Sequence, residues 1–169
     1  MSYFIIIRGP LGVGKTTISK RLADMLGAEY FSIDKIFEEY QLDPSDPELE
    51  SIPVSSYIKA HDIVLPAAHE ALARGQVVIF DSCYYFKEPI EQLIQQLPYD
   101  HYIFSLKAPL EVCIDRDSKR DKVYGKEAAE AVHNLVARFD WGHVIDTSKG
   151  IDLAVAEILS FLPVHTKKV

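Results

Sequence analysis

A glycine-rich loop that ends in lysine and threonine carries the most specific chemical pattern in this sequence. Residues 9–16 read Gly-Pro-Leu-Gly-Val-Gly-Lys-Thr and match Gly-x-x-x-x-Gly-Lys followed by Ser or Thr. Such a loop turns successive backbone N–H groups inward around a phosphate, and the helix after it directs its positive end at the same anion. The predicted nucleotide-binding residues are Gly9, Leu11, Gly12, Val13, Gly14, Lys15, Thr16 and Thr17.

Two side chains of the loop have defined chemistry toward a bound nucleotide. Lys15 can reach the β- and γ-phosphates, and the Thr16 hydroxyl can ligate Mg²⁺. A glycine-rich turn without a ligand is the alternative, but an apolar run at 3–7 precedes the loop and an amphipathic stretch at 18–26 follows it. Strand, loop and helix form the context that the motif requires. We therefore predict ATP and Mg²⁺ as cofactors and Lys15 as a catalytic residue.

Two aspartates follow apolar runs and are the candidate carboxylates of the site. Asp81 ends the run at 77–80, which is typical of a carboxylate that contacts Mg²⁺ directly or through water. Asp34 follows the run at 28–33 and could accept a proton from a substrate hydroxyl while orienting it toward the γ-phosphate. The alternatives are a turn-capping role for Asp81 and an N-cap role for Asp34 in a helix over 35–40.

A charged segment at 116–122 supplies candidate cations for the transferred phosphoryl group. Phosphoryl transfer needs mobile positive charges that close over the transferring group and stabilise its charge. Arg116 and Arg120 are four residues apart, so on a helix they would share one face. We predict that both are catalytic residues of a lid at about 116–126. A solvated charged surface is the alternative.

Apolar runs alternate with stretches of helical periodicity along the whole chain. Predicted strands lie at 3–8, 28–33, 77–81, 101–106 and 144–146; predicted helices lie at 14–26, 35–40, 55–74, 89–97, from 109, at 126–140 and at 151–162. This alternation predicts an α/β fold, with a parallel sheet covered on both faces, in a single domain over 1–169. Ligands of such sheets bind beyond the carboxyl ends of the strands, where Asp34, Asp81 and the loop would meet.

Bulk properties narrow the class of partner. The formal net charge of −7 argues against long nucleic acids, which need a basic surface, but not against a short oligonucleotide end. No run is long enough for a membrane span or has the flanks of a signal peptide, so we expect a cytoplasmic protein without a membrane partner. Cys83 and Cys113 have no ligand-like spacing and predict neither a disulfide framework nor a zinc site.

With these elements in place, the chain resembles the small phosphate-loop (P-loop) kinases, a group that includes adenylate, shikimate and adenylylsulfate kinases and chloramphenicol phosphotransferase. The resemblance is carried by residues 9–16, by Phe31-Ser32-Ile33-Asp34, by Cys113-x-x-Arg116-x-x-x-Arg120 and by residues 144–148. It implies a three-layer P-loop fold whose five parallel strands, numbered along the chain, have the order 2-3-1-4-5. It also implies an acid beside the acceptor hydroxyl and a lid beginning near Arg116.

The acceptor region, at about 35–75, departs from that group. Ser32 stands where shikimate kinases carry an extra acid, and residues 35–73 contain no arginine, only two lysines against eight acids. This excess of acidic residues would suit a neutral or cationic hydroxyl compound. Whether the aromatic residues at 84–86 line the acceptor pocket or pack under the next helix stays open.

The sequence therefore predicts an enzyme, an ATP-dependent kinase that phosphorylates a hydroxyl group of a small molecule. Within enzymes, a nucleoside or nucleotide kinase and a kinase of polynucleotide ends are the alternatives. From another class, the alternative is a nucleotide-dependent switch or toxin-like regulator that binds ATP without a small acceptor.

Overall fold

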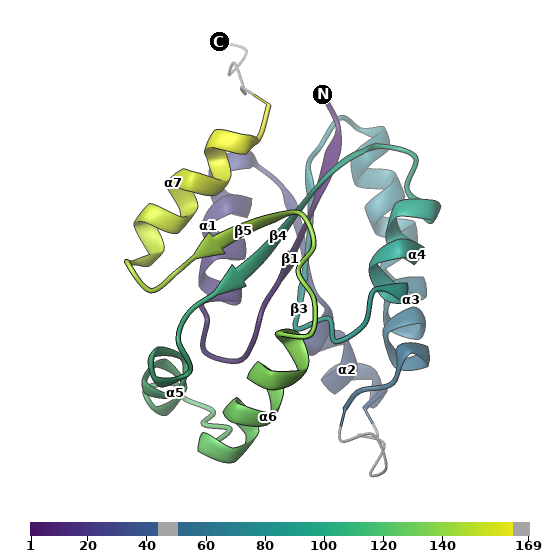
Figure 1. The fold of residues 1–169 in the computed structure, drawn as a ribbon. Coiled ribbons are helices and arrows are strands. Elements are labelled where there is room, and N and C mark those ends of the chain that lie inside the picture. Colours follow the sequence, from purple (N-terminus) through teal and green to yellow (C-terminus); the bar gives the residue numbers. More distant parts are fainter. Residues whose placement is uncertain (44–50, 164–169) are drawn as a thin grey trace.

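A parallel five-stranded sheet forms the centre of the protein in a computed structural model that describes residues 1–43 and 51–163 (Figure 1). The strands are β1 (Tyr3–Arg8), β2 (Glu29–Ser32), β3 (Val78–Ser82), β4 (Asp100–Lys107) and β5 (His143–Asp146). Their order is β2-β3-β1-β4-β5, and every neighbouring pair is parallel. The predicted fold class and strand order are confirmed.

Helices cover both faces of this sheet. They are α1 (Lys15–Leu26), α2 (Ile33–Tyr40), α3 (Val54–Ala73), α4 (Glu88–Gln96), α5 (Leu110–Ser118), α6 (Lys126–Val136) and α7 (Ile151–Phe161). In Figure 1, α1 and α7 lie on one face and α3 and α4 on the other, while α5 and α6 lie beyond the carboxyl ends of the strands. Among the described residues, no helix is long and apolar enough to cross a bilayer.

Burial of the central strand β1 on both faces explains why its apolar run is continuous. Its side chains alternate between two separate cores, with Phe4 and Ile6 packed against residues of α3 and α4, and Ile5 and Ile7 packed against residues of α1 and α7. All six residues of the strand are buried. A strand covered on both faces has no solvent side and therefore needs apolar residues at nearly every position.

Two element boundaries differ from the predicted ones by two residues or more. Helix α2 begins at Ile33, two residues earlier than expected, because the Ile33 side chain is fully buried in the core shared with α3. Helix α6 ends at Val136 and not near residue 140. The buried Arg8 guanidinium donates hydrogen bonds to the backbone oxygens of Val136, the last residue of the helix, and of Phe139 beyond it, at 3.0 and 2.8 Å. Within the predicted acceptor region, at about 35–75, residues 44–50 lie outside the described residues.

A buried polar chain joins α3 to α4 and to the segment after β3. His61 is fully buried, with Nδ1 2.8 Å from Gln92 Oε1 and Nε2 2.9 Å from the Tyr84 hydroxyl. Because Gln92 donates its amide nitrogen to Asp62, its oxygen faces His61 and requires a proton on Nδ1. Nε2 is then the acceptor of the Tyr84 hydroxyl, and the ring is neutral. Burial lowers the pKa of His61 from 6.5 to about 4, against a smaller opposing effect of Gln92.

Acid should destabilise the protein through His61. Between pH 6.5 and about 4 the unfolded chain binds a proton that the folded protein excludes, so stability falls as the pH falls through this window. The full effect, reached below about pH 4, is on the order of 3 kcal/mol. Urea unfolding at pH 7 and pH 4.5 should show a smaller pH dependence for His61→Gln than for the parent. The exposed His69→Gln, on the same helix, should keep the parental dependence, and equal dependence in all three proteins would contradict the assignment.

Candidate active site

The glycine-rich loop has the backbone geometry that anion binding requires. Gly12 and Gly14 have φ values of +75° and +105°, a region that other residues rarely adopt. A Cβ at Gly12 would also lie 2.1 Å from the carbonyl oxygen of Cys113, so the position has no room for a side chain. Gly14 forms the N-cap of α1, whose first turn contains no acidic residue and no side-chain cap. The positive end of α1 therefore faces the loop without a competing carboxylate, and the loop fits a phosphate.

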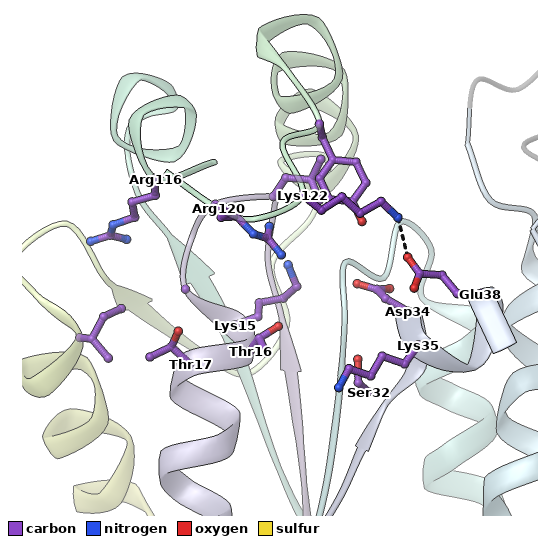
Figure 2. A pocket seen from close by; sticks show the side chains of 15 residues that line it. Lys15, Thr16, Thr17, Ser32, Asp34, Lys35, Glu38, Arg116, Arg120 and Lys122 are labelled. Carbon is purple, nitrogen blue, oxygen red and sulfur yellow. Dashed lines mark hydrogen bonds and ion pairs between the residues drawn. The ribbon is translucent and has the colours of Figure 1, made fainter. Parts of the chain in front are cut away.

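A pocket of about 580 Å³ opens over this loop (Figure 2). It is lined by Leu11, Gly12, Gly14, Lys15, Thr16, Thr17, Ser32, Asp34, Lys35, Glu38, Arg116, Arg120, Lys122, Tyr124 and Ile151. Nine of these were predicted from the sequence as site residues, and they come from the loop, from α2 and from the lid segment, residues 116–126. Three other predicted residues, Gly9, Val13 and Asp81, do not line it. The fold thus brings together loop, carboxylate and lid cations at the carboxyl edge of the sheet, as ligand sites in such sheets are arranged.

Lys15 keeps its positive charge although it is buried. Its Nζ donates to the backbone oxygen of Pro10 at 3.0 Å. Burial alone would lower the pKa of Lys15, but Cys83 and the carboxyl groups of Asp34 and Asp81 together raise it above its ordinary value. In Figure 2 the side chains of Lys15 and Arg120 point toward one another, and the Asp34 side chain lies opposite them. Two converging cations in a pocket favour a multiply charged anion there.

Asp34 is the half-buried carboxylate of the pocket. It is the second residue of α2, whose N-cap is Ser32, so the predicted N-cap role of Asp34 is not the one it has. A carboxylate in the first turn still interacts favourably with the helix dipole. Its Oδ1 accepts a hydrogen bond of 2.8 Å from the Ser82 hydroxyl at the end of β3. Sequence reasoning missed Ser82, although its place at the end of a strand next to β2 could have indicated the contact.

Asp81 lies beneath the pocket and not on its wall. It is 1 % exposed, and its Oδ2 accepts a hydrogen bond of 2.6 Å from the Tyr30 hydroxyl. Burial raises the pKa of Asp81 above its ordinary value, against the opposing effects of Tyr30 and Lys15. Among the described residues no group of three His, Cys, Asp or Glu side chains could hold a metal ion. A role of Asp81 toward Mg²⁺ stays a prediction.

The two lid arginines have different surroundings. Arg116 is fixed: it donates to the Val13 backbone oxygen at 3.1 Å and to the side chain and backbone of Thr147 at 3.0 and 2.6 Å. Arg120 lies beyond the end of α5 at Ser118, so the prediction that both share one helical face is wrong. The backbone turns out of the helix there, with Arg120 N bonding to Asp117 O at 3.1 Å. Both arginines nevertheless line the pocket.

Asp117 holds the lid segment in a compact turn. The carboxylate is buried, and its Oδ2 accepts hydrogen bonds from the backbone N–H groups of Tyr124 and Gly125 at 3.1 and 3.0 Å. Arg120 lies 4.0 Å from the same carboxylate. Across the pocket Lys122 pairs with Glu38 of α2 at 2.7 Å, which joins the lid segment to the acceptor side (Figure 2). The turn and this exposed ion pair were not predicted, because charged runs usually form solvated surfaces.

Removing the Asp117 charge should loosen the lid segment. Asp117→Asn weakens charge-assisted bonds to two amides, and hydrogen bonds to charged groups contribute about 1.5–3 kcal/mol each. Trypsin should then cleave after Lys119, Arg120 or Lys122 at least about tenfold faster than in the parent. Asp115→Asn is the matched control, because Asp115 lies on the same helix and pairs with Lys119 at the surface. Equal cleavage rates in Asp117→Asn and the parent would show that Asp117 does not hold the turn.

The aromatic residues after β3 belong to the core. Tyr84 is fully buried and Tyr85 is 9 % exposed, and neither lines the pocket. Tyr57 stacks on Tyr84, with ring centroids 5.5 Å apart, and meets Tyr85 edge to face at 6.2 Å. These rings support the acceptor side of the pocket from behind.

Comparisons with known proteins agree with this fold. An unliganded sugar kinase from Janibacter sp. HTCC2649 superposes with a TM-score of 0.77 at 17% identity, over 95% of this chain and 94% of that one. The tunicamycin resistance protein of Deinococcus radiodurans does so with a TM-score of 0.68 at 22% identity, over 98% of both chains. A shikimate kinase of Actinobacillus succinogenes is 49% identical over 35 residues, which is 21% of this chain and only 20% of that enzyme.

The family is shown by a longer match. The profile of the AAA domain family matches residues 5–133, which include the glycine-rich loop, Asp34 and the lid segment. The structural neighbours include a gluconokinase and a sugar kinase. The chain therefore belongs to the AAA domain family and has the fold of the small P-loop kinases.

Proposed function

We propose that this protein transfers the γ-phosphoryl group of ATP to a hydroxyl group of a small molecule. The observation that carries the proposal is the placement of Asp34 opposite Lys15 and Arg120 in one pocket. A carboxylate there can take the proton of an acceptor hydroxyl, while the two cations stabilise negative charge on the phosphoryl group.

Each pocket residue then has a distinct task. The loop amides and Lys15 bind the phosphates, and Arg120 approaches the transferred group from the lid segment. Asp34 accepts the proton as the acceptor oxygen bonds to the γ-phosphorus and the bond to the leaving ADP oxygen breaks. Arg116, which is held by its hydrogen bonds to Val13 and Thr147, forms part of the pocket wall.

Mg²⁺ fits this site through few protein ligands. Thr16 would ligate the ion, and the buried Asp81 would act on it through water, since one of its oxygens already accepts the Tyr30 hydroxyl. Mg²⁺ in kinase sites usually keeps several waters and binds substrate phosphates with only one or two carboxylates. When bound, the ion neutralises charge on the phosphates.

A neutral or amine-bearing acceptor suits the acceptor side best. The carboxylates of Asp34 and Glu38 line the pocket there together with one cation of the same helix, Lys35, and the arginines that line it, Arg116 and Arg120, come from the lid segment. Lys122 is paired with Glu38. An acceptor with two negative charges would have to compete with Asp34 and Glu38 for Lys35, or draw the other cations away from their partners or from ATP. Because a sugar kinase is among the structural neighbours, sugars, amino sugars and polyols are the first compounds to test.

A screen for acceptor-dependent ADP release tests the proposal. The purified protein receives Mg²⁺-ATP with sugars, amino sugars, polyols, hydroxy amino acids, nucleosides, nucleoside monophosphates or shikimate. We expect a neutral or amine-bearing hydroxyl compound to raise ADP release at least about tenfold over the acceptor-free rate. AMP, CMP, UMP or shikimate as the best acceptor would refute the acceptor class but not the kinase. Slow ADP release that no compound stimulates would indicate a nucleotide-dependent switch.

A further inference from the structure

A buried serine lies directly behind the pocket carboxylate. Ser82 is the last residue of β3 and is fully buried, and its hydroxyl donates to Asp34 Oδ1 at 2.8 Å. The strand register pairs Ser32 with Asp81, so β2 has ended and α2 has begun at the level of Ser82. The bond therefore joins the end of one strand to the first turn of a helix, across 48 residues of sequence.

This contact constrains the carboxylate on one side only. Among the hydrogen bonds of residues 1–43 and 51–163, Ser82 is the partner of Oδ1, while Oδ2 has none. A hydrogen bond from a buried donor restricts the side-chain rotamer of Asp34 and thereby the directions that its second oxygen can take. Groups that carry out proton transfer must lie within hydrogen-bond reach of the proton they accept, and small errors in placement lower the rate strongly.

We propose that Ser82 is a positioning residue that holds Asp34 through Oδ1 and leaves Oδ2 for the acceptor hydroxyl. The inference rests on the proposed function, because it assumes that Asp34 acts on the acceptor. A purely structural serine at this place would contribute to stability without changing the chemical step.

The test compares the parent with Ser82→Ala, Ser82→Thr and the double variant Ser82→Ala/Asp34→Asn. Ser82→Ala should lower kcat with the best acceptor of the screen about 10- to 100-fold, with the KM for ATP within about threefold of the parent. Ser82→Thr keeps the hydroxyl and should restore most of kcat. The double variant should be no slower than Asp34→Asn alone, because Ser82 acts only through Asp34.

Ser105→Ala is the matched control. Ser105 is also a buried serine, near the end of β4 and separated from β3 by β1, but its hydroxyl contacts Arg8 and the backbone of Trp141. Its loss should lower thermal stability and leave kcat within about threefold of the parent. If Ser82→Ala does not fold, Ser82→Cys provides the weaker donor, and its kcat should fall between those of Ser82→Thr and Asp34→Asn.

Two further outcomes would overturn the proposal in different ways. Normal kcat in Ser82→Ala, or in Ser82→Cys where the former does not fold, combined with slow Asp34→Asn, would reject the positioning role alone. Normal kcat in Asp34→Asn would reject the role of Asp34 and that of Ser82 with it.

Discussion

Lys15→Ala is expected to lower the rate of phosphoryl transfer by at least about 10³. Lys15 is a buried cation whose charge is maintained by Cys83, Asp34 and Asp81, and it points toward the space that the phosphates would fill. A charge that is already desolvated and oriented stabilises a transition state more strongly than an exposed one. The fold should persist, because Lys15 Nζ has a single backbone partner, the Pro10 carbonyl.

Lys20→Ala is the control for this substitution. Lys20 is an exposed residue of the same helix and lies outside the pocket. The kcat and the thermal midpoint of Lys20→Ala should both match those of the parent. Parental turnover in a folded Lys15→Ala protein, established by circular dichroism and steady-state ADP release, would contradict the phosphate site.

Asp34→Asn should lower kcat by roughly 10²–10⁴ while the affinity for ATP changes little. Asparagine keeps the size of the side chain, and its amide oxygen can still accept the Ser82 hydroxyl, but it cannot take a proton from the acceptor. Helix α2 loses one favourable interaction with its dipole, which is about 0.3–1 kcal/mol. Kinetics and equilibrium unfolding of the same preparation separate these effects.

Glu39→Gln removes a carboxylate from the same helix at an exposed position that does not line the pocket. It should leave kcat unchanged. If Asp34→Asn shows a rate close to that of Glu39→Gln, the carboxylate serves the helix and not the reaction.

The parts of this fold that depend on local sequence could be predicted from it. The apolar run of β1 reports burial on both faces, and Gly27 ends α1 because its φ of +61° suits glycine. The loop motif predicts its own backbone geometry, because glycine readily adopts the positive φ that Gly12 and Gly14 have. The strand order came from resemblance, because alternation alone leaves several orders open.

What the sequence could not show depends on contacts between distant residues. Arg8 looks like an ordinary strand end, yet it is buried and binds carbonyl groups 128 and 131 residues away. Ser82 reaches Asp34 across 48 residues. Asp117 acts locally, but its place in a charged run hid its burial. In each case a buried polar side chain has hydrogen-bond partners in the folded chain that composition and spacing do not report.

The fate of the γ-phosphate tests the central claim most directly. The protein is incubated with Mg²⁺ and ATP labelled at the γ-position, together with the best acceptor of the screen, and the products are separated by chromatography. We expect the label on the acceptor, in amounts equal to the ADP formed, and neither product with Lys15→Ala. Label recovered only as inorganic phosphate, at a rate that the acceptor does not change, would contradict a kinase.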